Sequence, residues 1–263
     1  MKARAAYFAC VDFLDEMLGD FLAVLERDGL LDNTIIIYTS DHGELCGEHG
    51  LFWKNTWHEA SARVPLVIST PAHRNGELAA SEVSAPASLA DLYPTLCGLT
   101  DTPLADDLDG VDLSPAVQGD SCPAQENRPG AITESVSPRW GPGTEFRMIR
   151  NARYKYIAFR DCADLAFDLQ EDPDEQVNLA DKAEGSVAED LAQLKDAVLA
   201  GFSFDEAEAL RKRQVAELRE QYPGRVECRT PNQILRRDGK LVEADGALYK
   251  GEIISENPAG DFV

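Results

Sequence analysis

The sequence predicts an α/β fold that continues into a small antiparallel sheet. A helical pattern over residues 4–28 leads through a short loop into an apolar strand at 34–40, and a second apolar strand follows at 64–70. Further along, three β-type segments lie close together between residues 131 and 159. Alternation of helix and strand is typical of α/β domains, whereas closely spaced strands with short connections indicate antiparallel pairing.

The first predicted helix has an apolar stripe with helical spacing. Its members step by three or four positions: Val11, Leu14, Leu18, Phe21 and Leu25. Gly29 can end the helix in a left-handed conformation. Residues 34–40 contain hardly any polar side chain before Thr39, so we expect that strand to be buried on both faces.

The middle of the chain predicts one more strand and one more helix. Pro65 places the strand at 64–70 at a strand start or at a sheet edge. Residues 84–98 predict a helix in which Pro94 indicates a kink or a late start. We expect residues 101–130 to be a loop, because they show no periodicity.

The C-terminal part changes to an antiparallel style and then to a long helix. We expect strands at 131–134, 145–150 and 154–159, a short one at 165–169, and one helix over 187–221. The predicted division is 1–125 for the α/β part, 126–221 for the small sheet with its helix, and 222–263 for an extended tail.

Composition excludes several classes of protein. The formal net charge of −22 argues against a nucleic-acid surface, and no apolar run reaches the length of a membrane span. The N-terminus has an amphipathic pattern instead of the apolar core of a signal peptide. The six cysteines form no CxxC pair, and we expect reduced thiols and a cytoplasmic location.

The most informative stretch is the end of the strand at 34–40. Asp41, His42 and Gly43 follow it directly, and Lys54 comes twelve positions after His42. Ligand chemistry in open α/β sheets gathers beyond the carboxyl ends of strands. A carboxylate and an imidazole can bind one cation, and a lysine can hold an oxyanion. Taken alone, Asp41-His42-Gly43 would more often be a simple turn.

Four motifs in order carry a family resemblance over about residues 4–180. They are Thr39-Ser-Asp-His-Gly-Glu44, then Gly47-Glu-His-Gly-Leu51 with Lys54 and Arg63-Val-Pro65, then Asp91-Leu-Tyr-Pro-Thr-Leu96, and finally Arg147–Tyr156 with Phe167–Leu179. This pattern resembles the sulfatase family of the alkaline-phosphatase-like superfamily, in particular the branch with choline sulfatases and phosphonate monoester hydrolases. The resemblance implies part of that sandwich, a mixed sheet flanked by helices, with a small C-terminal antiparallel sheet.

The resemblance also implies a chemistry. Asp41 and His42 would be ligands of a divalent cation, Ca²⁺ first and Mn²⁺ or Mg²⁺ as alternatives. Lys54 would contact an oxygen of a small sulfate, phosphate or phosphonate ester. His58, which would lie one helical turn beyond Lys54, is a second catalytic candidate as proton donor or substrate contact.

The pattern lacks the nucleophile of the family. No cysteine or serine begins the Cys/Ser-x-Pro/Ala-x-Arg motif that yields formylglycine, and the early Asp-Asp metal pair is absent. We therefore expect a C-terminal sulfatase portion that is inactive alone, with formylglycine in a missing N-terminal half. The alternatives are a phosphonate or phosphodiester hydrolase, or a non-catalytic remnant that binds a partner or forms a homo-oligomer.

Three nearby residues, His49, Glu59 and Arg63, have structural interpretations. We expect His49 to fix the loop from Gly47 to Gly50. Arg63 and Glu59 are four positions apart, and we favour an ion pair between them over a catalytic role.

Overall fold

The computed structural model describes residues 2–136, 141, 143–221, 233–235 and 241–243. The chain divides into two compact units, Met1–Phe204 and Asp205–Val263, and each is described by itself. Every helix within the described ranges is too short or too polar to span a bilayer. The three-part division predicted from the sequence stays a prediction.

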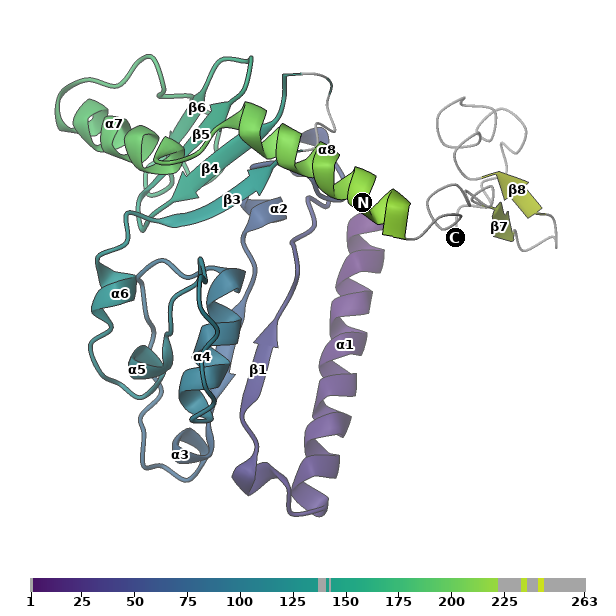
Figure 1. Ribbon diagram of the computed structural model, residues 1–263. Helices are drawn as coiled ribbons and strands as arrows, with labels where there is room; N and C mark the ends of the chain where they lie inside the picture. The colour runs from purple at the N-terminus through teal and green to yellow at the C-terminus, as the bar shows by residue number, and fades with distance from the viewer. Residues whose placement is uncertain (1, 137–140, 142, 222–232, 236–240, 244–263) are drawn as a thin grey trace. The chain divides into compact units, whose positions relative to one another are not determined.

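The first unit begins with the predicted helix and strand. Helix α1 (Lys2–Arg27) is followed by η1 (Leu31–Asn33) and strand β1 (Ile36–Thr39), and in Figure 1 the helix runs alongside the strand. Gly29 has a φ of 68°, and the N–H of Leu30 donates to the carbonyl of Leu25 at 2.9 Å, which ends α1 as expected.

Strand β1 pairs antiparallel with β2 (Leu66–Ser69), with Ile37 opposite Ile68. Pro65 directly precedes β2, at the strand start that the sequence predicted. The expectation that β1 is buried on both faces is wrong: Tyr38 is exposed, and the other strand residues are only half-buried. A paired strand covers an edge of β1 and not a face, and α1, which runs alongside β1, buries none of its own residues, so little packs on the faces of the strand.

Short helices fill much of the connection between β2 and the C-terminal sheet. The predicted helix at 84–98 begins only at Leu89, because Ser88 and Asp91 form a capping box at its start. Pro94 is the third residue of α4, where a helix does not need its N–H. The region 101–130, expected as loop, contains two short helices, α5 (Ser114–Val117) and α6 (Pro123–Glu126). The other helices of this connection are α3 (Pro71–Arg74), η3 (Leu89–Asp91) and α4 (Leu92–Leu99).

The predicted antiparallel sheet is present with all four strands in sequence order. They are β3 (Ala131–Ser135), β4 (Phe146–Arg150), β5 (Tyr154–Phe159) and β6 (Leu165–Asp168). Each face covers a separate cluster of buried side chains. On one face, Ile149 and Tyr156 pack against α7 (Gly185–Leu199). On the other, Met148 and Ile157 pack with Trp57 from the segment before α2 (Glu59–Ala62).

The helix expected over 187–221 is two helices. Gly201, with a φ of 63°, separates α7 from α8 (Phe204–Gln221), because a left-handed residue cannot continue a right-handed helix. Within 222–263 the described residues form β7 (Gln233–Leu235) and β8 (Leu241–Glu243), which pair antiparallel. The rest of the predicted tail lies outside the described residues.

Candidate active site

Asp41 and His42 lie together just beyond the end of β1. The Oδ2 atom of Asp41 is 3.3 Å from Nε2 of His42, and its Oδ1 atom accepts the backbone N–H of His42 at 3.0 Å. The side chain of Asp41 is 83% exposed, so its oxygens are open to a ligand. Burial would raise the pKa of Asp41, but the neighbouring His42, its backbone amide and the ammonium of Lys54 together hold that pKa below its usual value.

Lys54 comes to the same place from a different loop. Its Nζ atom is 2.6 Å from Nε2 of His42. The other ring nitrogen, Nδ1, is 2.8 Å from the carbonyl oxygen of Gly43, which can only accept, so this contact assigns the ring proton to Nδ1. The lone pair of Nε2 therefore faces the ammonium of Lys54. The structure thus brings together three of the four predicted site residues.

These three residues line one side of a cleft of about 790 Å³. The cleft extends past α2 to the first two strands of the antiparallel sheet, and its lining includes Arg63 and Arg150. The space is large enough for a small ester. Its lining has both signs of charge: His42, Lys54, Arg63 and Arg150 on one hand, and Asp41, Glu59, Glu82 and Glu134 on the other.

Local backbone contacts explain why the sequence places these residues here. The N–H of Gly43 donates to the carbonyl of Ser61 at 2.8 Å, and a side chain at Gly43 would meet the Ala60 oxygen at 2.1 Å. Glu44 accepts the N–H of Trp53 at 2.6 Å, which brings the segment before Lys54 back toward β1. The glycine and the glutamate of the motif are therefore positioning residues for Asp41, His42 and Lys54.

A buried ion network connects the Lys54 segment to the antiparallel sheet. Lys155 of β5 is fully buried, and its Nζ atom contacts the carboxylates of Glu59 at 2.8 Å and Glu175 at 2.6 Å. The same atom donates to the carbonyl of Trp57 at 2.8 Å. Glu175 also accepts the N–H of Glu59 at 2.7 Å. This network fixes the chain just after Lys54.

Sequence reasoning did not assign these roles to Lys155 and Glu175. The signal was a lysine in the middle of the apolar strand Tyr154–Phe159, since a lysine is seldom fully buried unless it is paired. Glu59 was expected to pair with Arg63, and this is wrong. Its carboxylate contacts Lys155 and, at 3.5 Å, Arg150, because α2 is too short to bring Arg63 onto the same helical face.

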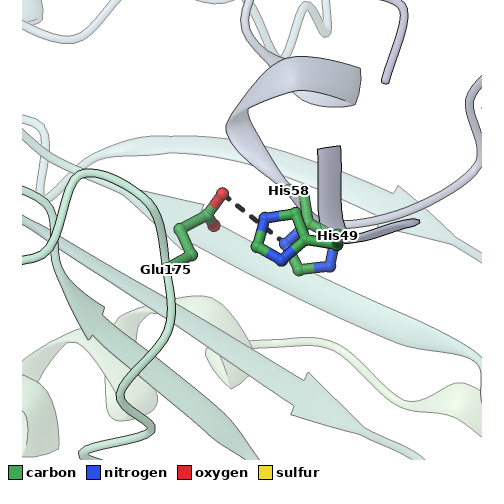
Figure 2. A group of neighbouring side chains, drawn as sticks. All are labelled: His49, His58 and Glu175. Carbon is green, nitrogen blue, oxygen red and sulfur yellow. Dashed lines mark ion pairs between the residues drawn. The ribbon is translucent and has the colours of Figure 1, made fainter. Parts of the chain in front are cut away.

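His58 does not lie in the cleft with Lys54. The chain around Lys54 is not helical, because Trp53 just before it and Asn55 just after it have φ values of 72° and 74°, so the assumed one-turn separation from His58 is wrong. His58 is buried at the N-cap of α2, and its ring stacks on that of His49 at 3.6 Å. Its Nδ1 atom faces Glu175 at 3.6 Å (Figure 2). A role as proton donor to the ester stays a prediction.

Comparison with known proteins gives a consistent family. Residues 2–102 match the sulfatase family. The chain is 39% identical over 190 residues to arylsulfatase K of Bos taurus, covering 68% of this chain and 33% of that protein. It is 35% identical over 189 residues to choline-sulfatase of Rhizobium meliloti strain 1021, covering 71% of this chain and 35% of that protein.

A solved structure supports the fold. The chain superposes on the phosphonate monoester hydrolase of Agrobacterium radiobacter with a TM-score of 0.64 and 28% identity, covering 91% of this chain and 45% of the other. The chain spans about a third of the length of arylsulfatase K and of choline-sulfatase, the curated relatives named above. With the α/β layers and the small antiparallel sheet, these likenesses identify the chain as a member of the sulfatase family, of alkaline-phosphatase-like fold.

Proposed function

We propose that this chain is the C-terminal portion of a metal-dependent sulfuric ester hydrolase. The observation that carries the proposal is the meeting of Asp41, His42 and Lys54 at one cleft, with 2.6 Å between Nζ of Lys54 and Nε2 of His42. The family and its sulfatase relatives support the reaction class. The short coverage of those relatives supports a partial chain.

The residues present fit a cation in part. The exposed carboxylate of Asp41 and Nε2 of His42 are 3.3 Å apart, and they offer one oxygen and one nitrogen to the same ion once the ammonium of Lys54 moves away from that nitrogen. Ca²⁺ takes six to eight oxygen ligands, so two side chains give half a site at most. When bound, a divalent cation would withdraw charge from the ester oxygens. Ca²⁺ is our first choice, with Mn²⁺ and Mg²⁺ as alternatives.

The chain's own residues would bind the charged oxygens of the ester in the cleft. The ammonium of Lys54 can bind a sulfuryl oxygen or the leaving oxygen, where negative charge develops during transfer. Arg63 lines the same cleft and adds a positive charge there, whereas the charge of Arg150 is paired with Glu59. The nucleophile would be a formylglycine outside this chain, so we propose that the chain alone does not turn over sulfate esters.

A chimera tests this proposal. The chain would replace the matched third of the choline-sulfatase of Rhizobium meliloti, and hydrolysis of an aryl sulfate would be measured with Ca²⁺ or Mn²⁺. We expect activity in the chimera, and a fall in kcat of at least about 100-fold for Lys54→Ala. The matched variant Lys212→Ala, on the exposed helix α8, should retain full activity. Turnover by the isolated chain, or an active Lys54→Ala chimera, would contradict the proposal.

The close variant of this function is hydrolysis of a phosphonate or phosphate diester. The likeness to the phosphonate monoester hydrolase favours it, and both reactions spread negative charge over transferred oxygens. The same chimera, assayed in parallel with an aryl sulfate and a phenyl phosphonate, separates the two. A higher kcat/KM for the phosphonate than for the sulfate would favour phosphonate hydrolysis as the function of this chain.

A non-catalytic interaction module is the second candidate. Helix α1 favours it, because it has no buried residue among the described residues and carries large exposed apolar side chains: Tyr7, Phe8, Val11, Phe13, Leu14, Met17, Phe21 and Val24. Exposed apolar surface of this extent is typical of an interaction site. A chain that forms a stable homo-oligomer, combined with a folded but inactive chimera, would favour this candidate.

A further inference from the structure

A second group of metal-ligating side chains lies outside the Asp41 and His42 pair. It consists of His49 in η2 (Glu48–Gly50), His58 at the N-cap of α2, and Glu175 in the turn between β6 and α7. Each offers one ligand atom, and these atoms all lie within 4.8 Å of one another. Figure 2 shows the two rings face to face, with the carboxylate directed at them.

Burial leaves this group without full hydrogen bonding. His58 is 9% exposed, and its Nδ1 atom has no hydrogen-bond partner in the part of the chain that the structure describes. Glu175 is 6% exposed, and its Oε2 atom lies 3.6 Å from that nitrogen, beyond the length of a hydrogen bond. A buried imidazole nitrogen without a hydrogen-bond partner beside a buried carboxylate is a position where an ion could bind both atoms from one side.

The group combines one carboxylate with two imidazoles. Lys155 contacts the other carboxylate oxygen of Glu175 at 2.6 Å, so the carboxylate belongs to an ion pair. The two rings are nearly parallel, at 13° and 3.6 Å, so both imidazoles lie together beside this carboxylate.

We propose that His49, His58 and Glu175 bind a divalent ion of the zinc type. Two imidazoles and one carboxylate suit Zn²⁺ and its first-row neighbours, whereas Ca²⁺ needs more oxygens. Ligands about 2.1 Å from a tetrahedral ion lie about 3.4 Å apart, close to the 3.6 Å between His58 and Glu175. Each ring must tilt out of the stack to direct a nitrogen at the ion in its own plane.

Lys155 would act on this site through Glu175. Its ammonium contacts Oε1 at 2.6 Å, while Oε2 accepts the N–H of Glu59 at 2.7 Å and faces His58. Contacts of this kind around a ligand fix its orientation and tune its affinity, and the positive charge of Lys155 would weaken the ion's binding. We therefore expect an affinity below that of a closed structural zinc site.

The position of the ligands gives the ion a role. His49 precedes Lys54 by five residues and His58 follows it by four, and Glu175 lies in the C-terminal part of the unit. One ion would hold both ends of the Lys54 loop against the turn that carries Glu175. This inference does not depend on the proposed hydrolase reaction, because it concerns a different set of ligands.

Zinc titration of the full chain tests the site. Isothermal titration with Zn²⁺ would be done in the Asp41→Asn/His42→Gln background, so that the candidate hydrolase site contributes no binding. We expect one Zn²⁺ per chain, and Co²⁺ in its place should give a visible d–d absorption without a thiolate charge-transfer band. His49→Asn should weaken binding by at least about 100-fold.

The controls separate ligand loss from unfolding. His49 is exposed with a φ of 52°, a conformation that asparagine adopts readily, so His49→Asn should keep the fold. Glu175→Gln gives a second ligand variant, and His73→Ala removes a histidine outside the cluster and should bind as the background does. Equal zinc affinity in His49→Asn and the background, or no binding in the background, would overturn the site.

Discussion

The antiparallel sheet and helix α1 belong to the same compact unit but differ in how their side chains are buried. In β5 all residues before Phe159 are buried, and both faces of the sheet cover a core. In α1, which is 26 residues long, none is buried. Burial of apolar side chains is the main source of stability. The free energy of folding therefore comes mostly from the sheet.

The candidate chemistry lies in the weakly packed part. Asp41 and His42 follow β1, and Lys54 is in an irregular loop, whereas the cores lie on β4 to β6. Lys155 connects the two parts, since it binds the carbonyl of Trp57 and the carboxylate of Glu59 from within the sheet. The exposed site thus depends for its geometry on a buried cation in another element.

Removal of that cation should give the largest loss of stability. Lys155→Met leaves Glu59 and Glu175 without their ammonium partner, and breaking a buried pair in this way costs about 3–5 kcal/mol. The free energy of unfolding in urea would measure the change. Lys212→Met, in an exposed pair with Glu208, is the matched control and should change it by less than about 1 kcal/mol. Equal effects of the two variants would show that the network does not hold the loop.

Two substitutions that shorten an apolar side chain, one in β5 and one in α1, test the difference in packing between the sheet and the helix. Ile157→Ala removes a fully buried side chain of β5 and should lower the free energy of unfolding by about 3 kcal/mol. Leu14→Ala in α1 removes a side chain that is 52% exposed, and should cost less than about 1 kcal/mol. Both are measured by urea denaturation. A large loss for Leu14→Ala would mean that α1 is covered in solution by something that stabilises it.

Acid should weaken the contacts that hold the Lys54 loop to the antiparallel sheet, because it protonates Glu175. The pKa of this group is about 2 in the folded chain, against 4.5 for a free glutamate. Its contribution is therefore complete above pH 4.5 and lost as pH falls from 4.5 toward 2, and amounts to about 3 kcal/mol. Urea denaturation between pH 2.5 and 6 would measure it. Glu175→Gln should be less stable but should show a shallower fall over this range; parallel curves would contradict the assignment.

The sequence predicted the regular elements better than their surroundings. The alternating strands of the sheet and the 3, 4, 3, 4 spacing of α1 are local patterns, and all of them appear in the structure. Burial of β1 was mispredicted because it depends on which elements pack on the two faces of the strand, and the strand's own residues do not encode this. The break at Gly201 was missed because helix propensity on both sides is high.

The candidate site was predictable where the chain places residues side by side. Asp41 and His42 are adjacent, and Lys54 followed from the motif. His58 was misplaced because the left-handed residues Trp53 and Asn55 redirect the loop, and neither is a glycine that would have signalled it. The contact of Lys155 with Glu175 depends on the turn after β6, so only the folded chain brings it about.

The smallest effect on stability should come from the exposed face of α1, where the comparison is sharpest. Phe13 is 63% exposed and Phe21 is 57% exposed, so the double variant Phe13→Ser/Phe21→Ser gives up little buried area and should change the free energy of unfolding by about 0.5 kcal/mol or less. Its self-association, measured by light scattering against concentration, should fall, because exposed apolar side chains drive association in water. If the variant instead loses several kcal/mol with no change in mass, α1 is packed in solution and the contrast between α1 and the sheet is lost.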